Sequence, residues 1–305
     1  MNMLEIDRAF YTQYGAPAIH EAFPDYEGRI AAGLAGAGSE CFGFDDAVSR
    51  DHDVYAGFQL WLTDEDEAKI GFRLSALYDR LPREFMGVPT EHRSRMGDGK
   101  LGVRRIGDFY RQFTGSPGAP ESWRQWLYAP SYTLAQAVNG AVFCDPLGEF
   151  SRIRQEIATG MPEDVRLKKI AARAALMAQS GQYNYRRCLA HGEPGAAVLA
   201  LDEFVRNAAE LAFLLCRRHM PFYKWALRAM RELPGYAGTE ALLTALLAGS
   251  CPREETIEAV SAQFIARLRE QGLTDGAWDF LEPHAYEVME RIETPEIRAL
   301  HVMEG

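Results

Sequence analysis

One short polar segment constrains the fold of this chain more than any other part. It begins with Gly38 and Ser39 and, after a gap of eleven residues, reaches Asp51 and Asp53. If Asp51 opens a strand, the two-residue period of a strand directs both carboxylates to one face. Two carboxylates on one face repel each other unless a cation lies between them. Mg²⁺ prefers such oxygen ligands and often shares them with substrate phosphates, so the segment predicts a metal site at the start of a strand.

The Gly-Ser turn supplies the second part of this predicted site. Glycine leaves backbone N–H groups open to a phosphate, and the serine adds a hydroxyl donor. An isolated Asp-x-Asp is more often a solvated strand end, so the interpretation depends on both elements occurring together. The neighbouring Asp45 and Asp46 are expected to shape the loop. Cys41 is expected to be a small buried residue, because the sequence places no histidine to activate it.

Strand and helix patterns alternate in the first third of the chain. The aromatic run Val54–Leu62 predicts a strand. Asp64 is expected to cap a helix that continues to about Tyr78. Leu101–Ile106 predicts a further strand, and Gly107–Phe113 a helix.

Helical periodicity dominates beyond about residue 120, apart from a strand-like run at Gly140–Cys144. Leu201–Arg218, for example, places its apolar side chains on one helical face. We therefore predict a mixed α+β fold, with a small mixed sheet and helices followed by a helical bundle. The expected domains are a small α/β domain over 1–117 and a mainly helical domain over 118–305.

Composition excludes several classes of protein. The formal net charge of −10 argues against an extended nucleic-acid surface, which needs clustered Lys and Arg. The five cysteines are scattered without a CxxC pair, so neither a zinc site nor a disulfide framework is expected. No apolar run is long enough to span a bilayer. We expect a cytoplasmic protein with no membrane partner.

Taken together, these residues resemble the nucleotidyltransferase superfamily, whose members carry Gly-Ser, a gap of about ten residues and then Asp-x-Asp at a strand. The longer string GSECFGFDDAVSRDHD is similar to one bacterial subgroup, the uncharacterised DUF4037 family. Supporting similarities lie at IGDFYRQFTG, GAVFCDPLG and PFYKW, so that the resemblance covers about residues 20–235.

The resemblance implies a reaction as well as a nucleotidyltransferase-like fold. Such enzymes move a nucleoside monophosphate from a nucleoside triphosphate to an acceptor and release pyrophosphate. By this resemblance Asp51 and Asp53 are the catalytic carboxylates and hold one or two Mg²⁺ ions, and Gly38 and Ser39 hold the triphosphate. The acceptor, a small molecule or a protein side chain, is expected in the cleft between the two domains.

Two basic residues of the helical part are further candidates for nucleotide binding. Lys224, within PFYKW, is expected to contact phosphates, and the alternative is a surface lysine beside a core tryptophan. Arg186 suits phosphate because its guanidinium binds two oxygens at once. An ordinary position on a helix face is the alternative for Arg186.

The chain departs from the superfamily pattern at one position. A third acid is usual on a later strand, but the best alignment places Gly102 there. Asp108 or Glu91 are the acids that could serve instead. The alternative function is therefore a catalytically degenerate fold that binds a nucleotide or a partner protein. A kinase has little support, because GxxxxGK[ST] and the HRD/DFG pair are absent.

Overall fold

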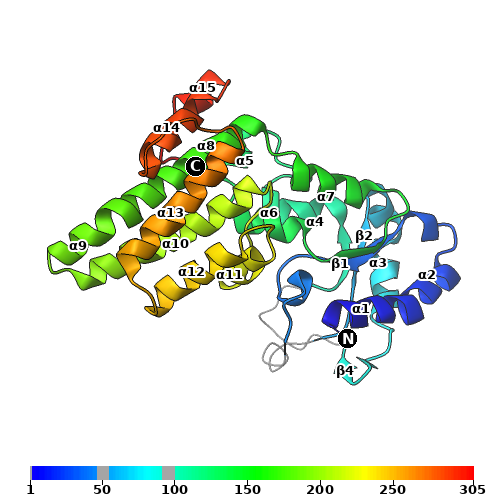
Figure 1. The fold of residues 1–305 in the computed structure, drawn as a ribbon. Helices are drawn as coiled ribbons and strands as arrows, with labels where there is room; N and C mark the ends of the chain where they lie inside the picture. The colour runs from blue at the N-terminus through cyan, green and yellow to red at the C-terminus, as the bar shows by residue number, and fades with distance from the viewer. Residues whose placement is uncertain (1, 47–54, 91–99) are drawn as a thin grey trace. The chain divides into compact units, whose positions relative to one another are not determined.

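The computed structural model describes residues 2–46, 55–90 and 100–305, and this chain divides into two compact units (Figure 1). The first unit comprises residues 1–121 and 136–160. The second comprises residues 122–135 and 161–305. Each unit is considered by itself below.

The first unit combines a small sheet with helices on both of its faces. Its described elements are α1 (Met3–Phe10), η1 (Tyr11–Gly15), α2 (Ala16–Ala22), η2 (Glu27–Arg29), β1 (Ala31–Leu34), η3 (Glu40–Phe42), β2 (Gln59–Leu62), α3 (Asp64–Tyr78), β3 (Glu84–Phe85), β4 (Val88–Pro89), β5 (Gly102–Arg105), α4 (Ile106–Thr114), β6 (Ala141–Cys144) and α7 (Glu149–Thr159).

The sheet is mixed. Among the described residues four strands lie in the order β5-β2-β1-β6, and β3 and β4 form a separate small hairpin. β1 is antiparallel to both of its neighbours. β5 runs parallel to β2, and this pairing sets Gln59 opposite Gly102.

The side chains of β2 alternate between two packed faces, as the period of a strand requires. Leu60 joins a hydrophobic cluster with Phe10 of α1 and Leu74 of α3. Trp61 stacks on Phe150 of α7, with 3.7 Å between ring centroids and 17° between ring planes. The sheet is therefore covered by α1 and α3 on one face and by α7 on the other.

The strand predicted at Val54–Leu62 is shorter in the structure, which assigns only Gln59–Leu62 to β2. The preceding backbone N–H groups bond to groups outside the sheet ladder. Ala56 N donates to the carbonyl of Pro89 at 2.9 Å, and Phe58 N donates to the Tyr78 hydroxyl at 3.1 Å. Residue 54 lies outside the described residues.

The helix predicted from Asp64 to Tyr78 is confirmed as α3, but its predicted cap was wrong. Thr63 is the N-cap, and its hydroxyl accepts the backbone N–H of Asp66 at 3.1 Å. Asp64 is instead the first helical residue. Thr63 has extended backbone and a short hydroxyl side chain, which together suit a cap better than a residue already in helical geometry.

The second unit is helical throughout its described residues. Its elements are α5 (Trp123–Tyr128), α6 (Ser131–Val138, within which the unit boundary falls), α8 (Glu163–Met177), η4 (Ala178–Tyr185), α9 (Arg186–Ala190), α10 (Pro194–Leu215), α11 (Tyr223–Arg231), α12 (Ala237–Ala248), α13 (Arg253–Glu270), α14 (Leu281–Glu290) and α15 (Pro295–Arg298). The predicted fold class, a small mixed sheet with helices followed by a helical part, is confirmed.

Helix α8 packs against α5, α10, α14 and α15 and buries basic side chains among them. The Lys168 ammonium donates to the carbonyl of Val302 at 3.0 Å and also to that of Glu304. Arg173 donates to the Glu210 carboxylate at 2.9 Å. Burial lowers the pKa of Lys168 to about 8. The second unit thus encloses positive charge that is bonded to backbone carbonyls at Lys168 and to a carboxylate at Arg173.

None of the helices in the described part of the chain is long and apolar enough to span a lipid bilayer.

Candidate functional site

The loop that follows β1 contains the predicted Gly-Ser turn. Gly38 has φ +120°, a region that favours glycine. A Cβ atom at this position would lie 2.4 Å from the carboxylate oxygens of Glu40. The Gly38 backbone is exposed, and Ser39, the N-cap of η3, is half-buried. The backbone conformation therefore favours glycine at position 38, and a side chain there would also displace the Glu40 carboxylate.

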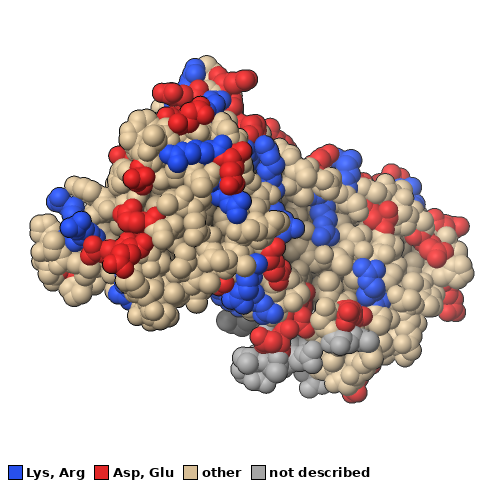
Figure 2. All heavy atoms as spheres, viewed as in Figure 1, with Lys and Arg blue, Asp and Glu red and all other residues tan. Residues whose placement is uncertain are grey.

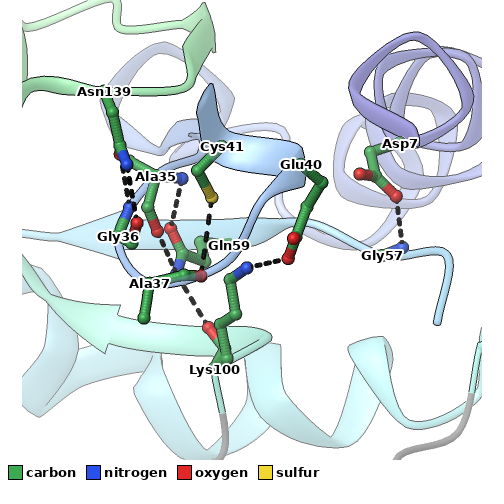
Figure 3. Close-up of polar contacts among 10 residues, drawn as sticks. All are labelled: Asp7, Ala35, Gly36, Ala37, Glu40, Cys41, Gly57, Gln59, Lys100 and Asn139. Carbon is green, nitrogen blue, oxygen red and sulfur yellow. Dashed lines mark hydrogen bonds and ion pairs between the residues drawn. The ribbon is translucent and has the colours of Figure 1, made fainter. Parts of the chain in front are cut away.

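Two amide side chains hold the start of this loop in place (Figure 3). Gln59 accepts the backbone N–H of Ala35 at 3.1 Å and donates to the Ala35 carbonyl at 3.2 Å. Asn139 accepts the N–H of Gly36 at 2.8 Å and donates to the Gly36 carbonyl at 2.7 Å. Each amide side chain thus satisfies both polar groups of one loop residue, as a neighbouring strand would.

A lysine lies beside the turn. Lys100 forms an ion pair with Glu40, and their side chains are 26% and 28% exposed. The Lys100 carbonyl accepts from Gln59 at 2.8 Å, which ties this residue to the same amide that holds the loop. Burial works to lower the pKa of Lys100, but the neighbouring Cys41 and Glu40 outweigh it and raise that pKa. A charged ammonium is therefore available next to Gly38.

Cys41 is buried, as the sequence predicted. Its thiol lies 3.8 Å from the carbonyl of Ala37 and donates to it. Burial raises the pKa of the Cys41 thiol to about 12. The thiol is therefore neutral at physiological pH, which does not favour a nucleophilic role.

A buried carboxylate, that of Asp7, lies beside Gly57, which follows the segment with Asp51 and Asp53 in the sequence. Asp7 of α1 is 1% exposed and accepts the backbone N–H of Gly57 at 2.9 Å (Figure 3). Burial raises the pKa of Asp7 to about 7, although the Gly57 hydrogen bond and the charge of Lys100 oppose this shift. Asp7 therefore changes charge near neutral pH.

Asp51 and Asp53 lie outside the described residues, so their predicted role as metal ligands stays a prediction. Both flanks of their segment contact α1. On one side Asp45 accepts the backbone N–H of Met3 at 3.0 Å, and on the other Gly57 donates to Asp7. Within the described ranges no group of three His, Cys, Asp or Glu side chains is arranged to hold a metal ion.

The position expected for a third acid is occupied by Gly102, opposite Gln59 in the sheet. All residues of β5 are described, and none is acidic. Asp108 in α4 is exposed and pairs with Arg111 of its own helix at 2.6 Å. Glu91, the other candidate, lies outside the described residues.

The two basic candidates, Lys224 and Arg186, lie in the second unit. Lys224 is exposed on α11, and its ammonium lies 4.9 Å from the ring centroid of Trp225. Arg186 begins α9, is 79% exposed and lies 3.8 Å from the carboxylate of Glu254. Both side chains are accessible to a ligand, and their predicted nucleotide contacts stay predictions.

Sequence reasoning missed Gln59, Asn139 and Lys100, which bond to the loop that carries the turn, and Asp7, which bonds to Gly57. A signal existed for one of them, since Gln59 is a polar residue within the apolar run VYAGFQLWL. A buried amide in a strand must bond to something, and here it bonds to the loop.

Comparison with known proteins gives one family and one structure. Residues 126–226 match the model of DUF4037, a domain of unknown function, which confirms the resemblance to that family for this part of the chain. The matched range contains Arg186 and Lys224. The solved structure of a nucleotidyltransferase-like protein from Exiguobacterium sibiricum 255-15 is similar over 92% of this chain and 81% of that chain, with 12% identity and a TM-score of 0.39. No curated protein matches the sequence.

Proposed function

We propose that this protein is a Mg²⁺-dependent nucleotidyltransferase, which moves a nucleoside monophosphate from a nucleoside triphosphate to a small molecule or a protein side chain. The observation that carries the proposal is the loop with Gly38 and Ser39, whose start at Ala35 and Gly36 is held by two amide side chains and which lies beside Lys100. In the reaction an acceptor oxygen bonds to the α-phosphorus, the bond from that phosphorus to the bridging oxygen breaks, and pyrophosphate leaves.

The roles of the turn follow from its geometry. The exposed backbone at Gly38 and the Ser39 hydroxyl would donate to phosphate oxygens. Lys100 would leave its ion pair with Glu40 and bind the triphosphate instead. There it would neutralise part of the negative charge of the phosphates. Because Gln59 and Asn139 already fix the loop, these donors need little rearrangement on binding, which favours catalysis by positioning.

The metal ligands in this proposal are Asp51 and Asp53. A pair of carboxylates is the donor set that Mg²⁺ prefers when it also binds phosphates. The ion would supply charge neutralisation at the triphosphate and alignment of the attacking and leaving oxygens. Lys224 and Arg186 are proposed as further contacts to nucleotide phosphates or base.

A second candidate function is nucleotide or partner binding without catalysis. The observation that favours it is β5, which carries Gly102 and no acid at the position next to Gln59. Both candidates require nucleotide binding at the turn if the ligand is a triphosphate, so binding and transfer must be measured separately.

Transfer of label from α-³²P nucleoside triphosphates tests the proposed enzyme. Wild type should label an acceptor in a cell extract, and Asp51→Asn/Asp53→Asn should lower the rate at least about a hundredfold, because the metal loses its ligands. Asp25→Asn, which changes an exposed acid of the same unit, is the control. Equal transfer by wild type and the double variant would contradict the assignment.

Calorimetry with Mg²⁺ and each triphosphate distinguishes the two candidates. Lys100→Gln should weaken triphosphate affinity about tenfold under both, because a charge-assisted contact to phosphate is lost, whereas the exposed Lys69→Gln should not. Binding without transfer supports the second candidate. If wild type binds no triphosphate, both the enzyme and the nucleotide-binding form of the second candidate are excluded.

A further inference from the structure

A pocket of about 390 Å³ lies between α12 and α13 of the second unit. The two helices pack against each other and are coloured yellow and orange in Figure 1. All the residues that line the pocket lie outside the range that matches DUF4037, and none of them belongs to the proposed transferase site. Pockets of this volume bind small molecules, and the groups that line this one determine which ligand it suits.

The first turn of α12 opens into this pocket. Gly238 and Thr239 line it, and the helix has no side-chain cap. The first backbone hydrogen bond of the helix runs from the Glu240 N–H to the Tyr236 carbonyl at 2.8 Å. Among the described residues the N–H groups of Ala237, Gly238 and Thr239 therefore have no acceptor. A Cβ atom at Gly238 would meet nothing within 4 Å, so a ligand can approach this backbone closely.

A buried hydroxyl in the same pocket also lacks a partner. Tyr236 lines the pocket and is only 4% exposed, and its hydroxyl makes no hydrogen bond within the described part of the chain. This oxygen is not one of the unpaired atoms that are sealed from solvent, so it reaches the open space of the pocket. Burial raises the pKa of Tyr236, although the charge of Arg267 opposes this shift. The hydroxyl therefore stays protonated and can donate to a ligand.

Two side chains of α13 add further donors. The Thr239 hydroxyl donates to the Gln263 carbonyl oxygen at 2.6 Å, which leaves the amino group of that amide without an acceptor among the described residues. Arg267 donates to the Gly235 carbonyl at 3.2 Å and to the Glu270 carboxylate at 3.1 Å. A guanidinium has five N–H groups, so Arg267 keeps donors for a ligand. Glu270 is 62% exposed and already paired, so its charge opposes an anion only weakly.

A ligand with several negatively charged oxygens suits this set of donors. The N-terminus of a helix directs its N–H groups at an anion and carries partial positive charge, and arginine binds two phosphate oxygens at once. Figure 2 shows Lys and Arg scattered among Asp and Glu over the described residues that face the viewer, with no broad basic area. That distribution and the formal net charge of −10 disfavour a long polyanion. One phosphate group on a small molecule meets both conditions.

We infer that this pocket binds a small organic molecule through a phosphate monoester group. The phosphate oxygens accept from the N–H groups of Gly238 and Thr239, from the Arg267 guanidinium and from the Tyr236 hydroxyl. The pocket is larger than a phosphate group alone, so the organic part occupies the remaining volume, beside the Gln263 amide. The inference is independent of the proposed transferase and adds a second ligand site in the other unit.

Backbone amide NMR signals of the ¹⁵N-labelled full chain test this site in EDTA and without nucleotide. Inorganic phosphate, the group shared by all such ligands, is the first probe, at constant ionic strength. The signals of Gly238 and Thr239 should shift in a saturable way, and glycerol 3-phosphate should shift the same signals. The first turn of α13 already carries Glu254 and Glu255, so its signals should not move. Phosphate bound at Gly38 changes signals of the first unit, so the two sites are read separately.

Matched variants identify the pocket. Gly238→Asp places a carboxylate in the pocket without a clash, and an acid in the first turn stabilises a helix, so phosphate binding should be lost while the chain stays folded. Gly195→Asp is the control, because it adds the same acid to the first turn of α10, again with nothing within 4 Å of the Cβ atom. Arg267→Gln should weaken binding at least about tenfold. Arg269→Gln, on the same helix, should not, because that arginine bonds to the Gly276 carbonyl.

Tyr236→Phe removes only the hydroxyl. It should weaken phosphate binding about threefold or more, and it should leave the urea midpoint unchanged because the hydroxyl has no partner in the described chain. A purely structural role of this tyrosine would give the opposite pattern.

The inference is overturned if phosphate leaves the Gly238 and Thr239 signals unchanged, or if Gly238→Asp binds phosphate as tightly as Gly195→Asp does. It is also overturned if acetate shifts these signals at the same concentration as phosphate, because the site is then not selective for phosphate. A shift with the free ion but none with glycerol 3-phosphate would exclude an organic phosphate.

Discussion

The first unit buries a carboxylate and the second buries ammonium groups, and in both the charged side chain is bonded to the backbone. Asp7 accepts from Gly57 in the first unit, and Lys168 donates to the Val302 carbonyl in the second. In the first unit neutral amides, such as Gln59, also hold backbone groups that no strand reaches. In each unit a buried side chain thus bonds to a backbone group outside regular secondary structure. The side chain is acidic in the first unit and basic in the second.

Asp7 and Lys168 therefore contribute opposite pH dependences to stability. The pKa of Asp7 is about 7 in the folded chain, above its unfolded value of about 3.9. Between these values the folded state holds more protons, so stability falls as pH rises. The pKa of Lys168 is about 8, below its unfolded value of about 10.4, so the unfolded state holds more protons there and stability rises with pH.

The largest expected effect tests whether the first unit depends on its amides. Gln59→Leu leaves both polar groups of Ala35 and the Lys100 carbonyl without this partner. The change should lower the free energy of unfolding on the order of 4 kcal/mol, since each buried group left unpaired costs about 1–3 kcal/mol. Urea denaturation measures it, with the exposed Gln13→Leu as control. Equal midpoints for the two variants would show that the loop needs no amide.

The second prediction tests how Asp7 changes the stability of the chain between pH 4 and pH 8. Asp7→Asn keeps an acceptor for Gly57 but removes the ionisable group. The variant should be more stable than wild type by roughly 4 kcal/mol at pH 8 and similar to it at pH 4, because a shift of about three pKa units corresponds to that free energy. Thermal or urea unfolding between these pH values checks the prediction, and Asp25→Asn serves as the surface control. Parallel pH profiles for wild type and Asp7→Asn would refute it.

The smallest expected effect concerns the stability of the chain at alkaline pH, to which Lys168 of the second unit contributes. Lys168→Met removes a buried ammonium, and with it one part of the gain in stability that wild type shows as pH rises from about 8 to 10.4. Lys169, whose pKa burial also lowers to about 8, supplies another part. The gain lost should be about 2 kcal/mol. Urea unfolding at pH 8 and pH 10 measures it against Lys69→Met, which changes a half-exposed lysine. If Lys168→Met keeps the full slope of wild type, the buried ammonium of Lys168 does not contribute to this pH dependence.

Local patterns predicted the elements well. α3 matches the helix expected from Asp64 to Tyr78. The spacing of apolar residues and the residues that end a helix are both local features of the sequence, so they could be recognised without knowledge of the fold. The strand expected at Leu101–Ile106 is present as β5. β2 was overestimated because the bonds of Ala56, Gly57 and Phe58 go to partners elsewhere in the chain, which no local pattern records.

The candidate site was predicted only in part for the same reason. Gly38 was recognisable because a glycine next to serine is a local signal. Asn139 is 103 residues from Gly36, and Lys100 is 60 residues from Glu40. Contacts across such separations arise from the order of strands in the sheet, and periodicity along the chain does not encode that order.

The anchoring of both flanks of residues 47–54 to α1 has a thermodynamic consequence. Asp45 is bonded to Met3, and Gly57 to Asp7, one turn further along the same helix. The positions of Asp45 and Gly57 are therefore fixed relative to one another by α1. Bringing the two ends of a stretch of chain together costs conformational entropy, and these hydrogen bonds mean that this cost is met when the first unit folds. Helix α1 thus sets the separation between the two flanks of the segment that contains Asp51 and Asp53.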